Sequence, residues 1–403
     1  MDRERIAGIS QSMIRAGLAG AREPALVNEF CDRVVASGLP LARASVIIDT
    51  LHPVHEGRAF RWLRDEAPTE PVVEYGRTNR GGEVAESWQR SPFYHLAQTG
   101  GTILLRNLAP GEPLDFPLLE ELRDLGQTGY LALIHRFASE GTIGEMDCIY
   151  SSWVTDAPGG FTADHVEALG ELIPPFALAL KSASLSRILE TLVETYLGRD
   201  AGHRVLEGRI ERGVTDRIGA ALWYSDLRGF TPITESAPEQ IIPLLNDYAD
   251  AIISSVHEAG GDVLKLIGDG TLAIFKAGGP GQACRCALKA ERLMRSRVSD
   301  LNRRRAAEEL PTTDVYLALH IGEVFYGNIG SHDRLDFTVV GPAVNEASRI
   351  AALCRSIEKD VLISSSFAAA ACPEERSSMV SVGRYALKGV ERPQELFTLD
   401  SDQ

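Results

Sequence analysis

A short apolar run that ends in an aspartate and a glycine turn constrains this chain more than any other feature. Residues 220–224 have the composition of a buried strand, and Asp226 and Gly229 follow directly after it. A carboxylate at a strand end can hold a cation, and the backbone N–H groups of a tight turn can hold phosphate oxygens. This pattern predicts a site for a metal-bound polyphosphate.

A second carboxylate is expected at the same place. Residues 262–267 and 271–276 alternate between the two faces of a strand, and Gly268, Asp269 and Gly270 between them predict a hairpin turn. Two carboxylates together with substrate phosphates are the usual way in which Mg²⁺ is held in phosphoryl-transfer sites. The plain alternative is that Asp226 caps a helix and Asp269 is only a turn residue.

Composition and charge limit the partners of the protein. The chain has 403 residues, of which 44% are hydrophobic and 24% charged, as in an ordinary globular protein. Its net charge of −15 leaves no basic excess for a nucleic-acid backbone. We expect no membrane contact, because apolar stretches such as 130–134 are too short to span a bilayer. The absence of a signal-like N-terminus and of C-x-x-C pairs favours a cytoplasmic protein with reduced thiols.

The N-terminal half reads as an α+β domain. Helices are expected at 5–19, 24–38, 93–98 and 118–125, strands at 44–51, 59–63, 71–75, 102–105, 129–137 and 147–154, and a loop at 77–86. Thr162 predicts the N-cap of a long helix that reaches about residue 197 and is kinked at Pro174 and Pro175. Residues 129–137 (GYLALIHRF) and 148–180 resemble the last strands and the closing helix of a GAF domain. This resemblance implies a sensor domain over residues 1–180 whose small-molecule or other signal is unknown.

The segment after the two prolines is expected to link two domains. Its apolar residues recur at three- and four-residue spacing: Leu185, Ile188, Leu189, Leu192, Val193 and Tyr196. Such a stripe suits either a helix packed on its own domain or a parallel dimer stalk. We expect a helical linker over residues 181–208. Residues 197–214 contain four glycines, which favour a joint that can change its geometry.

Three motifs in the C-terminal half resemble the catalytic domain of the class III nucleotidyl cyclases, the adenylate and guanylate cyclases. They are SDLRGFT at 225–231, KLIGDG at 265–270 and FTVVGPAVNEASR at 337–349, and the resemblance covers about residues 209–400. It implies a ferredoxin-like, palm-type α+β domain over residues 209–403. The expected elements agree with this: strands at 219–225, 262–267, 271–276, 314–320, 323–329, 336–340, 361–364 and around Leu396, and helices at 238–258, 280–308 and 342–355.

The resemblance also implies roles for individual residues. Asp226 and Asp269 would hold two Mg²⁺ or Mn²⁺ ions per site. The turn that follows Asp226 would contact the nucleotide phosphates through Leu227, Arg228, Gly229, Phe230 and Thr231. Lys265 and Thr338 would read the purine, and this Lys–Thr pair resembles the class IIIb adenylate cyclases, which predicts ATP over GTP.

Helix 342–355 would supply the remaining groups. Asn345 and Arg349 lie four residues apart and share a face. By resemblance Asn345 orients the ribose and Arg349 stabilises the charge on the α-phosphate. In the family one protomer supplies the metal aspartates and the other supplies the purine-reading and helix residues, so the resemblance implies a homodimer.

The chain departs from the family at two positions. Tyr316 stands where the family often has an arginine, and Pro342 where it often has an aspartate. Arg228 is expected to compensate for the missing cation, and His320 is expected to be a core or interface residue. The sequence thus predicts a cytoplasmic, homodimeric adenylate cyclase regulated by its N-terminal domain. The alternatives are a guanylate cyclase and a non-catalytic nucleotide-binding module, while the absence of a GG[DE]EF stretch disfavours a diguanylate cyclase.

Overall fold

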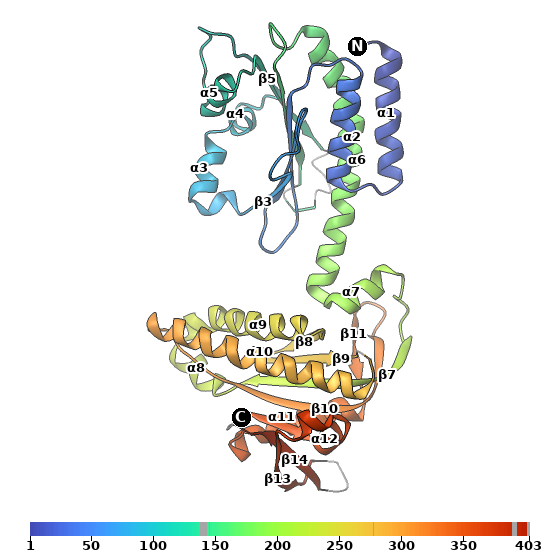
Figure 1. The fold of residues 1–403 in the computed structure, drawn as a ribbon, viewed down its shortest axis with the longest axis vertical. Helices are drawn as coiled ribbons and strands as arrows, with labels where there is room; N and C mark the ends of the chain where they lie inside the picture. Colours follow the sequence, from blue (N-terminus) through green and yellow to red (C-terminus); the bar gives the residue numbers. More distant parts are fainter. Residues whose placement is uncertain (138–142, 145, 277, 389–392, 401–403) are drawn as a thin grey trace. The chain divides into compact units, whose positions relative to one another are not determined.

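The computed structural model describes all residues except 138–142, 145, 277, 389–392 and 401–403. The chain divides into two compact units, Met1–Leu192 and Val193–Gln403 (Figure 1). Each unit contains one sheet with helices on both of its faces, so the fold class is mixed α/β.

The N-terminal unit is built on an antiparallel sheet in the order β3-β2-β1-β6-β5-β4. Its strands are β1 (Arg43–Asp49), β2 (Gly57–Leu63), β3 (Val72–Tyr75), β4 (Ile103–Asn107), β5 (Gly129–Arg136) and β6 (Cys148–Thr155). One face carries α1 (Arg3–Leu18), α2 (Glu23–Ala36) and α6 (Ala163–Leu197), and the other carries α3 (Glu83–Gln89), α4 (Pro92–Thr99) and α5 (Pro117–Asp124) (Figure 1). The helices and strands expected from the sequence are therefore present.

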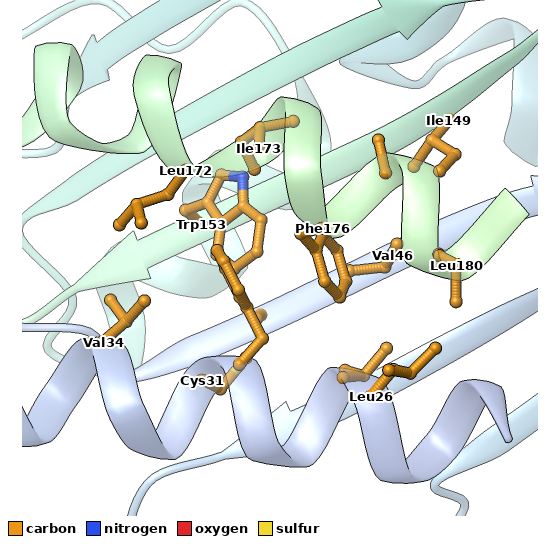
Figure 2. Packing of buried hydrophobic residues seen from close by; sticks show 14 of the residues in the cluster. Leu26, Cys31, Val34, Val46, Ile149, Trp153, Leu172, Ile173, Phe176 and Leu180 are labelled. Atoms are coloured by element: carbon orange, nitrogen blue, oxygen red, sulfur yellow. The ribbon is translucent and has the colours of Figure 1, made fainter. Parts of the chain in front are cut away.

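The main core of this unit lies under α2 and α6. Phe30 of α2 stacks on Phe176 of α6 with ring centroids 4.3 Å apart and also meets Trp153 of β6 at 5.5 Å. Figure 2 shows Trp153 and Phe176 among Leu26, Cys31 and other apolar side chains of the same cluster. Burying aromatic rings of this size is a large part of what holds the helices on the sheet.

One expectation for this unit is wrong. Residues 77–86 were expected to form a loop, but the structure has a 3₁₀ turn, Thr78–Arg80, followed by α3. Gly81 and Gly82 have positive φ and redirect the chain, and Glu83 and Glu86 then stand in the first turn of α3, where acidic side chains favour a helix. The polar composition of this stretch therefore reflects the exposed first turn of a helix and not a loop.

Helix α6 runs without interruption through Pro174 and Pro175. The Thr162 hydroxyl accepts a hydrogen bond from the His165 N–H at 3.3 Å, as its predicted capping role requires. Among the described residues, α6 is the one helix that is long and apolar enough, by length and composition alone, to cross a membrane. Its first half packs into the core of the N-terminal unit, which is also how the core helix of a globular domain behaves.

The C-terminal unit is built on a larger sheet in the order β13-β14-β12-β10-β7-β9-β8, and β11 pairs with β10 beside this path. Its strands are β7 (Thr215–Leu227), β8 (Asp262–Ile267), β9 (Gly270–Phe275), β10 (Val315–Gly330), β11 (Leu335–Val340), β12 (Val361–Ser364), β13 (Met379–Tyr385) and β14 (Gln394–Leu399). The two strands expected at 314–320 and 323–329 are one strand, β10. It stays paired with β7 from Val315 to Gly327, so the chain does not turn at Gly322.

Helices cover both faces of this sheet. The long helices α9 (Ile241–Glu258) and α10 (Pro280–Ala307) pack on one face, and α11 (Pro342–Ile357) packs on the other (Figure 1). The shorter ones are α7 (Arg199–Leu206), α8 (Phe230–Ser236), η2 (Pro238–Gln240), α12 (Ser365–Ala370) and α13 (Pro373–Arg376). Helix α7 occupies the segment that the sequence suggested as a joint, and α8 begins within the expected phosphate turn.

Candidate active site

The two predicted metal ligands meet at the end of β7. Asp226 lies near the C-terminal end of this strand, and Asp269 lies in the turn in which Ile267 opposes Gly270. The pKa of Asp226 is raised to about 6 by its burial, by the negative charge of Asp269 and by a hydrogen bond shared between the two carboxyl groups. The pair is therefore two acids in contact in a partly buried place.

A glycine eases the packing beside this pair. A Cβ atom on Gly270 would lie 3.0 Å from the carbonyl oxygen of Ser225 and 3.5 Å from Oδ1 of Asp226. The contact of 3.0 Å is tighter than most Cβ contacts, so a glycine here eases the close packing of β9 against the end of β7. The hairpin motif thus supplies Asp269, and its Gly270 lets β9 approach the backbone at Ser225.

This arrangement fits a divalent cation. Two carboxylates that repel each other are stabilised by a shared positive charge, and no lysine or arginine pairs with either of them within the described part of the chain. The same part holds no group of three or more His, Cys, Asp or Glu side chains placed to bind a metal. The pair would therefore supply two ligands and leave the others to phosphate oxygens and water, as is usual for Mg²⁺.

The turn after Asp226 is only partly available to a phosphate. The N–H of Arg228 donates to the carbonyl of Asp314 at 2.8 Å, and the carbonyl of Arg228 accepts from the Thr313 hydroxyl. Gly229 then adopts a left-handed conformation, with φ of 65°, and caps α8. The expected backbone contribution of Arg228 is thus used within the fold, whereas the first-turn amides of α8 at Phe230 and Thr231 have no partner inside that helix.

The side chain of Arg228 lies close to the departure at Tyr316. Tyr316 opposes Asp226 across the β7–β10 ladder, and the Arg228 guanidinium lies 5.8 Å from the centre of the Tyr316 ring. Nη1 of Arg228 is also 3.5 Å from Oδ1 of Asp360. The structure therefore places the Arg228 guanidinium beside Tyr316, the residue that stands where the family often has an arginine.

Lys265 has a partner that the sequence did not indicate. A register shift after Val263 precedes it on β8, and its ammonium forms an ion pair with Asp336 of β11. Thr338, the expected partner, lies two residues further along β11 and opposes Gly327. Because strand residues alternate, Asp336 and Thr338 share a face, and their even spacing is the signal that would have drawn attention to Asp336.

Helix α11 presents the last two predicted residues. It packs on the sheet through buried residues that include Ala343, Ala347 and Ile350. Asn345 is exposed, and Arg349, one turn further, is half-buried with no ion-pair partner among the described residues. Pro342 occupies the first turn of the helix, as the sequence predicted.

The predicted residues form three groups in one chain. The first is Asp226 with Asp269, the second is Lys265 with Asp336 beside Thr338, and the third is on α11. Within the described residues, no hydrogen bond or ion pair joins one group to another. A single chain therefore presents the parts of a site without linking them.

His320 lies in the interior, as expected. Its Nδ1 atom is 2.9 Å from the Ser364 hydroxyl and 3.2 Å from that of Ser366, and its Nε2 atom is 3.7 Å from a carboxylate oxygen of Glu346. Burial lowers the pKa of His320, although the charge of Glu346 opposes this shift. These neighbours show a core histidine bound to side chains of its own unit.

The C-terminal half is similar to known proteins. Residues 215–401 match the family described as the adenylate and guanylate cyclase catalytic domain. An adenylate cyclase of Anabaena cylindrica is 32% identical in an alignment of 228 residues, which covers 53% of this chain and 44% of that protein. The chain thus spans less than half the length of the curated relatives it matches.

Two solved structures are also similar over about half of the chain. The adenylyl cyclase CyaB from P. aeruginosa is 25% identical, with a TM-score of 0.43 over 47% of this chain and 97% of that chain. The guanylyl cyclase Cya2 is 27% identical, with a TM-score of 0.41 over 47% of this chain and 96% of that chain. From the family match and the Anabaena relative, residues 215–401 are a class III adenylate/guanylate cyclase catalytic domain.

Proposed function

We propose that this chain is an adenylate cyclase that converts ATP into 3′,5′-cyclic AMP and pyrophosphate. The observation that carries the proposal is the contact of Asp226 with Asp269 at the end of β7, inside a cyclase catalytic domain. The half-buried Arg349 on α11 supports it, because an arginine without an ion-pair partner among the described residues is ready to receive a phosphate.

Each group has a defined task in this reaction. Asp226 and Asp269 would hold two divalent ions, Mg²⁺ or Mn²⁺, which when bound favour ionisation of the ribose 3′-hydroxyl and neutralise the triphosphate. Asn345 orients the ribose, so that its 3′-oxygen lies in line with the α-phosphate. Arg349 donates hydrogen bonds to that phosphate as negative charge builds on it, and the first amides of α8 hold the other phosphate oxygens.

The choice of ATP rests on the purine-reading residues. Lys265 donates to a ring nitrogen, and Thr338 can donate or accept through its hydroxyl. The Anabaena relative is an adenylate cyclase, which supports the same substrate. A guanylate cyclase is the competing proposal, and the identity of the cyclic product distinguishes the two.

The site would be assembled by two copies of the chain. The resemblance to the class III cyclases implies that one protomer supplies the aspartate pair and the other supplies the lysine and α11, and the three groups are indeed not linked among the described residues of one chain. In this proposal the N-terminal unit is a GAF-like sensor for an unidentified signal, and it acts through α6 and α7 on how often a complete site exists. The nucleotide substrate suits a cytoplasmic location.

The experiment is cyclic-nucleotide formation by the purified full-length protein with ATP or GTP and Mg²⁺ or Mn²⁺. We expect cyclic AMP from ATP and a loss of at least about 100-fold in Asp226→Asn, because one metal ligand is removed. The melting temperature of this variant should stay the same or rise, since the repulsion between the two acids disappears. Asp250→Asn, an exposed change on α9, should leave the activity unchanged.

Three outcomes would overturn the proposal or a part of it. Full activity of Asp226→Asn would exclude the carboxylate pair as the metal site. Tight nucleotide binding without any cyclic product, under all four conditions, would instead favour the non-catalytic module. Cyclic GMP as the main product would replace ATP by GTP in the proposal.

A further inference from the structure

The backbone of Arg228, two residues after Asp226, is held by the segment that leads into β10. The Arg228 N–H donates to the carbonyl of Asp314 at 2.8 Å, and the Arg228 carbonyl accepts a hydrogen bond from the Thr313 hydroxyl. The same hydroxyl lies 3.3 Å from the Asp314 carbonyl, so the Arg228 carbonyl is its closer acceptor. The peptide planes on both sides of the Arg228 Cα atom are therefore fixed by two neighbouring residues.

The orientation of the peptide between Arg228 and Gly229 decides where the Gly229 N–H points. This peptide is trans, and the C=O and N–H of a trans peptide point in opposite directions. Because the Arg228 carbonyl points to the Thr313 hydroxyl, the Gly229 N–H points away from Thr313. Gly229 is exposed, and its N–H has no hydrogen-bond partner among the described residues. This N–H is therefore available to an anion, and Gly229 is one of the residues expected to contact the nucleotide phosphates.

Gly229 does not fix this orientation by itself. It has φ of 65°, and a Cβ on it would meet no atom within 4 Å. A glycine also reaches other turn conformations, so the peptide plane before it can rotate by about half a turn at little local cost. The Arg228 carbonyl oxygen would then take the place of the Gly229 N–H and repel a phosphate. The hydrogen bond from Thr313, a residue outside the turn, selects the orientation that favours an anion.

Thr313 is in turn held by the two long helices of the unit. It is buried, its N–H donates to the hydroxyl of Tyr248 on α9 at 2.8 Å, and its carbonyl accepts from the side-chain amide of Asn302 on α10 at 2.8 Å. The Tyr248 hydroxyl donates to the Asn302 side-chain oxygen. Arg305, also on α10, donates to the carbonyl of Pro311 at 2.8 Å. The segment is thus fixed to α9 and α10 and can act as a rigid support for the turn.

We infer that Thr313 is a positioning residue for phosphate binding, which acts through the Arg228 carbonyl and keeps the Gly229 N–H directed toward the nucleotide. The inference rests on the proposed cyclase function, since it concerns how that site holds its triphosphate. Thr313 lies 85 positions from Arg228, and none of the three sequence motifs includes it. The inference gives Thr313 no contact with the substrate and no part in holding the metal or the purine.

The test compares wild type with Thr313→Val, Thr313→Ala and Thr313→Ser. Valine has nearly the shape of threonine without the hydroxyl, so the Arg228 carbonyl loses its donor. The KM for ATP should rise about tenfold, the effect of one hydrogen bond to a charged group, and kcat should change less. Thr313→Ala lacks the hydroxyl as well and should show the same rise, which keeps the test decisive if valine does not fit. Thr313→Ser keeps the hydroxyl and should restore a KM close to that of wild type.

A matched control is the same substitution one position earlier. Thr312 is exposed, its side chain makes no hydrogen bond within the described residues, and Thr312→Val should keep the wild-type KM. Melting temperatures of all variants show whether they are folded at the assay temperature. A purely structural defect would lower the amount of active enzyme and hence kcat, without raising KM. An unchanged KM in folded Thr313→Val and Thr313→Ala, or a KM in Thr313→Ser as high as in Thr313→Val, would overturn the inference.

Binding measurements keep the inference separate from catalysis. The dissociation constant of 3′-deoxy-ATP with Mg²⁺, which lacks the attacking hydroxyl, should rise in Thr313→Val as KM does. If wild type forms no cyclic product but Thr313→Val still weakens this binding, the cyclase proposal fails and the role of Thr313 stands. If cyclic AMP forms and neither KM nor the dissociation constant changes, the role of Thr313 fails and the cyclase proposal stands. A wild type that neither binds the analogue nor forms a product would overturn both.

Discussion

Gly270 shows how one residue without a side chain can ease the packing of the strands beside the carboxylate pair. Its missing Cβ leaves room for the carbonyl oxygens of Ser225 and Ile267. Gly219, on the neighbouring strand β7, would meet no atom within 4 Å if it carried a Cβ. The two glycines therefore differ in what a methyl group would disturb, although both lie in strands of one sheet.

We expect Gly270→Ala to lower the free energy of unfolding by about 1–3 kcal/mol, because the added methyl group overpacks the end of β7. Its cyclase activity should fall as well, since the methyl group crowds the carbonyl of Ser225, the residue next to Asp226. Thermal denaturation and the cyclic AMP assay measure the two effects. Gly219→Ala should be close to wild type in both, and equal losses in the two variants would contradict this explanation.

His320 gives the C-terminal unit a dependence on pH. Burial lowers its pKa below the ordinary value of 6.5, so the folded state takes up a proton less readily than the unfolded state. Above pH 6.5 His320 is neutral in both states, and the free energy of unfolding is at its full value. As the pH falls below 6.5 toward the lowered pKa, the unfolded state takes up the proton first and this stability is lost. Each unit of difference between the two pKa values corresponds to about 1.4 kcal/mol.

Replacing His320 by asparagine should make the stability less dependent on pH. The amide can still bond to Ser364 but does not titrate. The fall in Tm between pH 7 and pH 5 should therefore be smaller in His320→Asn than in wild type. His332→Asn, at an exposed position, should keep the wild-type slope. If His320→Asn follows the wild-type curve, other groups carry the pH dependence.

At the scale of elements, α7 is attached to the catalytic sheet by charge. Asp200 of α7 pairs with Arg204 at 2.9 Å and with Lys276 at 2.7 Å, and Lys276 is also 3.2 Å from Asp262 of β8. Both cations lie over the ring of Tyr326, at 5.1 and 5.2 Å from its centre. The segment before the catalytic domain is thus bound to β8, the strand that carries Lys265.

Gly198 is the point where α7 approaches this sheet most closely. It has φ of +86°, and a Cβ on it would lie 2.5 Å from the carbonyl oxygen of Val263. We expect Gly198→Ala to release α7, so that the amides of 199–206 exchange hydrogen faster and Tm falls. Gly208 has a similar φ of +92° but no neighbour within 4 Å, so Gly208→Ala carries the backbone strain alone, about 1–2 kcal/mol. Equal exchange rates in the two variants would mean that contact with Val263 does not hold α7.

At the scale of the whole molecule, α6 has two apolar faces. One is buried in its own unit and includes Phe176, Leu180 and Ile188. The other is a stripe of Leu178, Leu185, Leu189, Leu192 and Tyr196 at heptad spacing, of which Leu178, Leu189 and Tyr196 are 64%, 54% and 79% exposed. Leu185 and Leu192 of this stripe also pack against the core of the N-terminal unit, so its exposed part consists of Leu178, Leu189 and Tyr196.

The exposed stripe makes the assembly of the protein testable. We expect Leu189→Glu to raise the dimer dissociation constant at least about tenfold, since each dimer loses two buried leucines. Cyclase activity at low protein concentration should fall in parallel. Sedimentation equilibrium measures the first effect, and Glu190→Gln, at the exposed neighbouring position, is the control. An unchanged dissociation constant would leave dimerisation to the catalytic domains alone.

Interactions between residues that are close in the chain could be predicted from the sequence alone. The amphipathic spacing of α9, the capping of α6 by Thr162 and the hairpin of β8 and β9 depend on neighbours within a few positions. Asp226 and Asp269 are far apart in the chain, and the resemblance of their motifs to the class III cyclases is what predicted that they meet. Where the local signal was weak, as in α3, the prediction failed.

Only the tertiary structure decided which distant groups meet. The register of β8 against β9 shifts before Lys265, and such a shift redirects every later side chain on the strand. Asp336 reaches Lys265, and the carbonyl of Asp314 takes the Arg228 N–H, through contacts between segments far apart in the chain. These contacts depend on how all strands of the sheet pack at once, and no local pattern of residues contains that information.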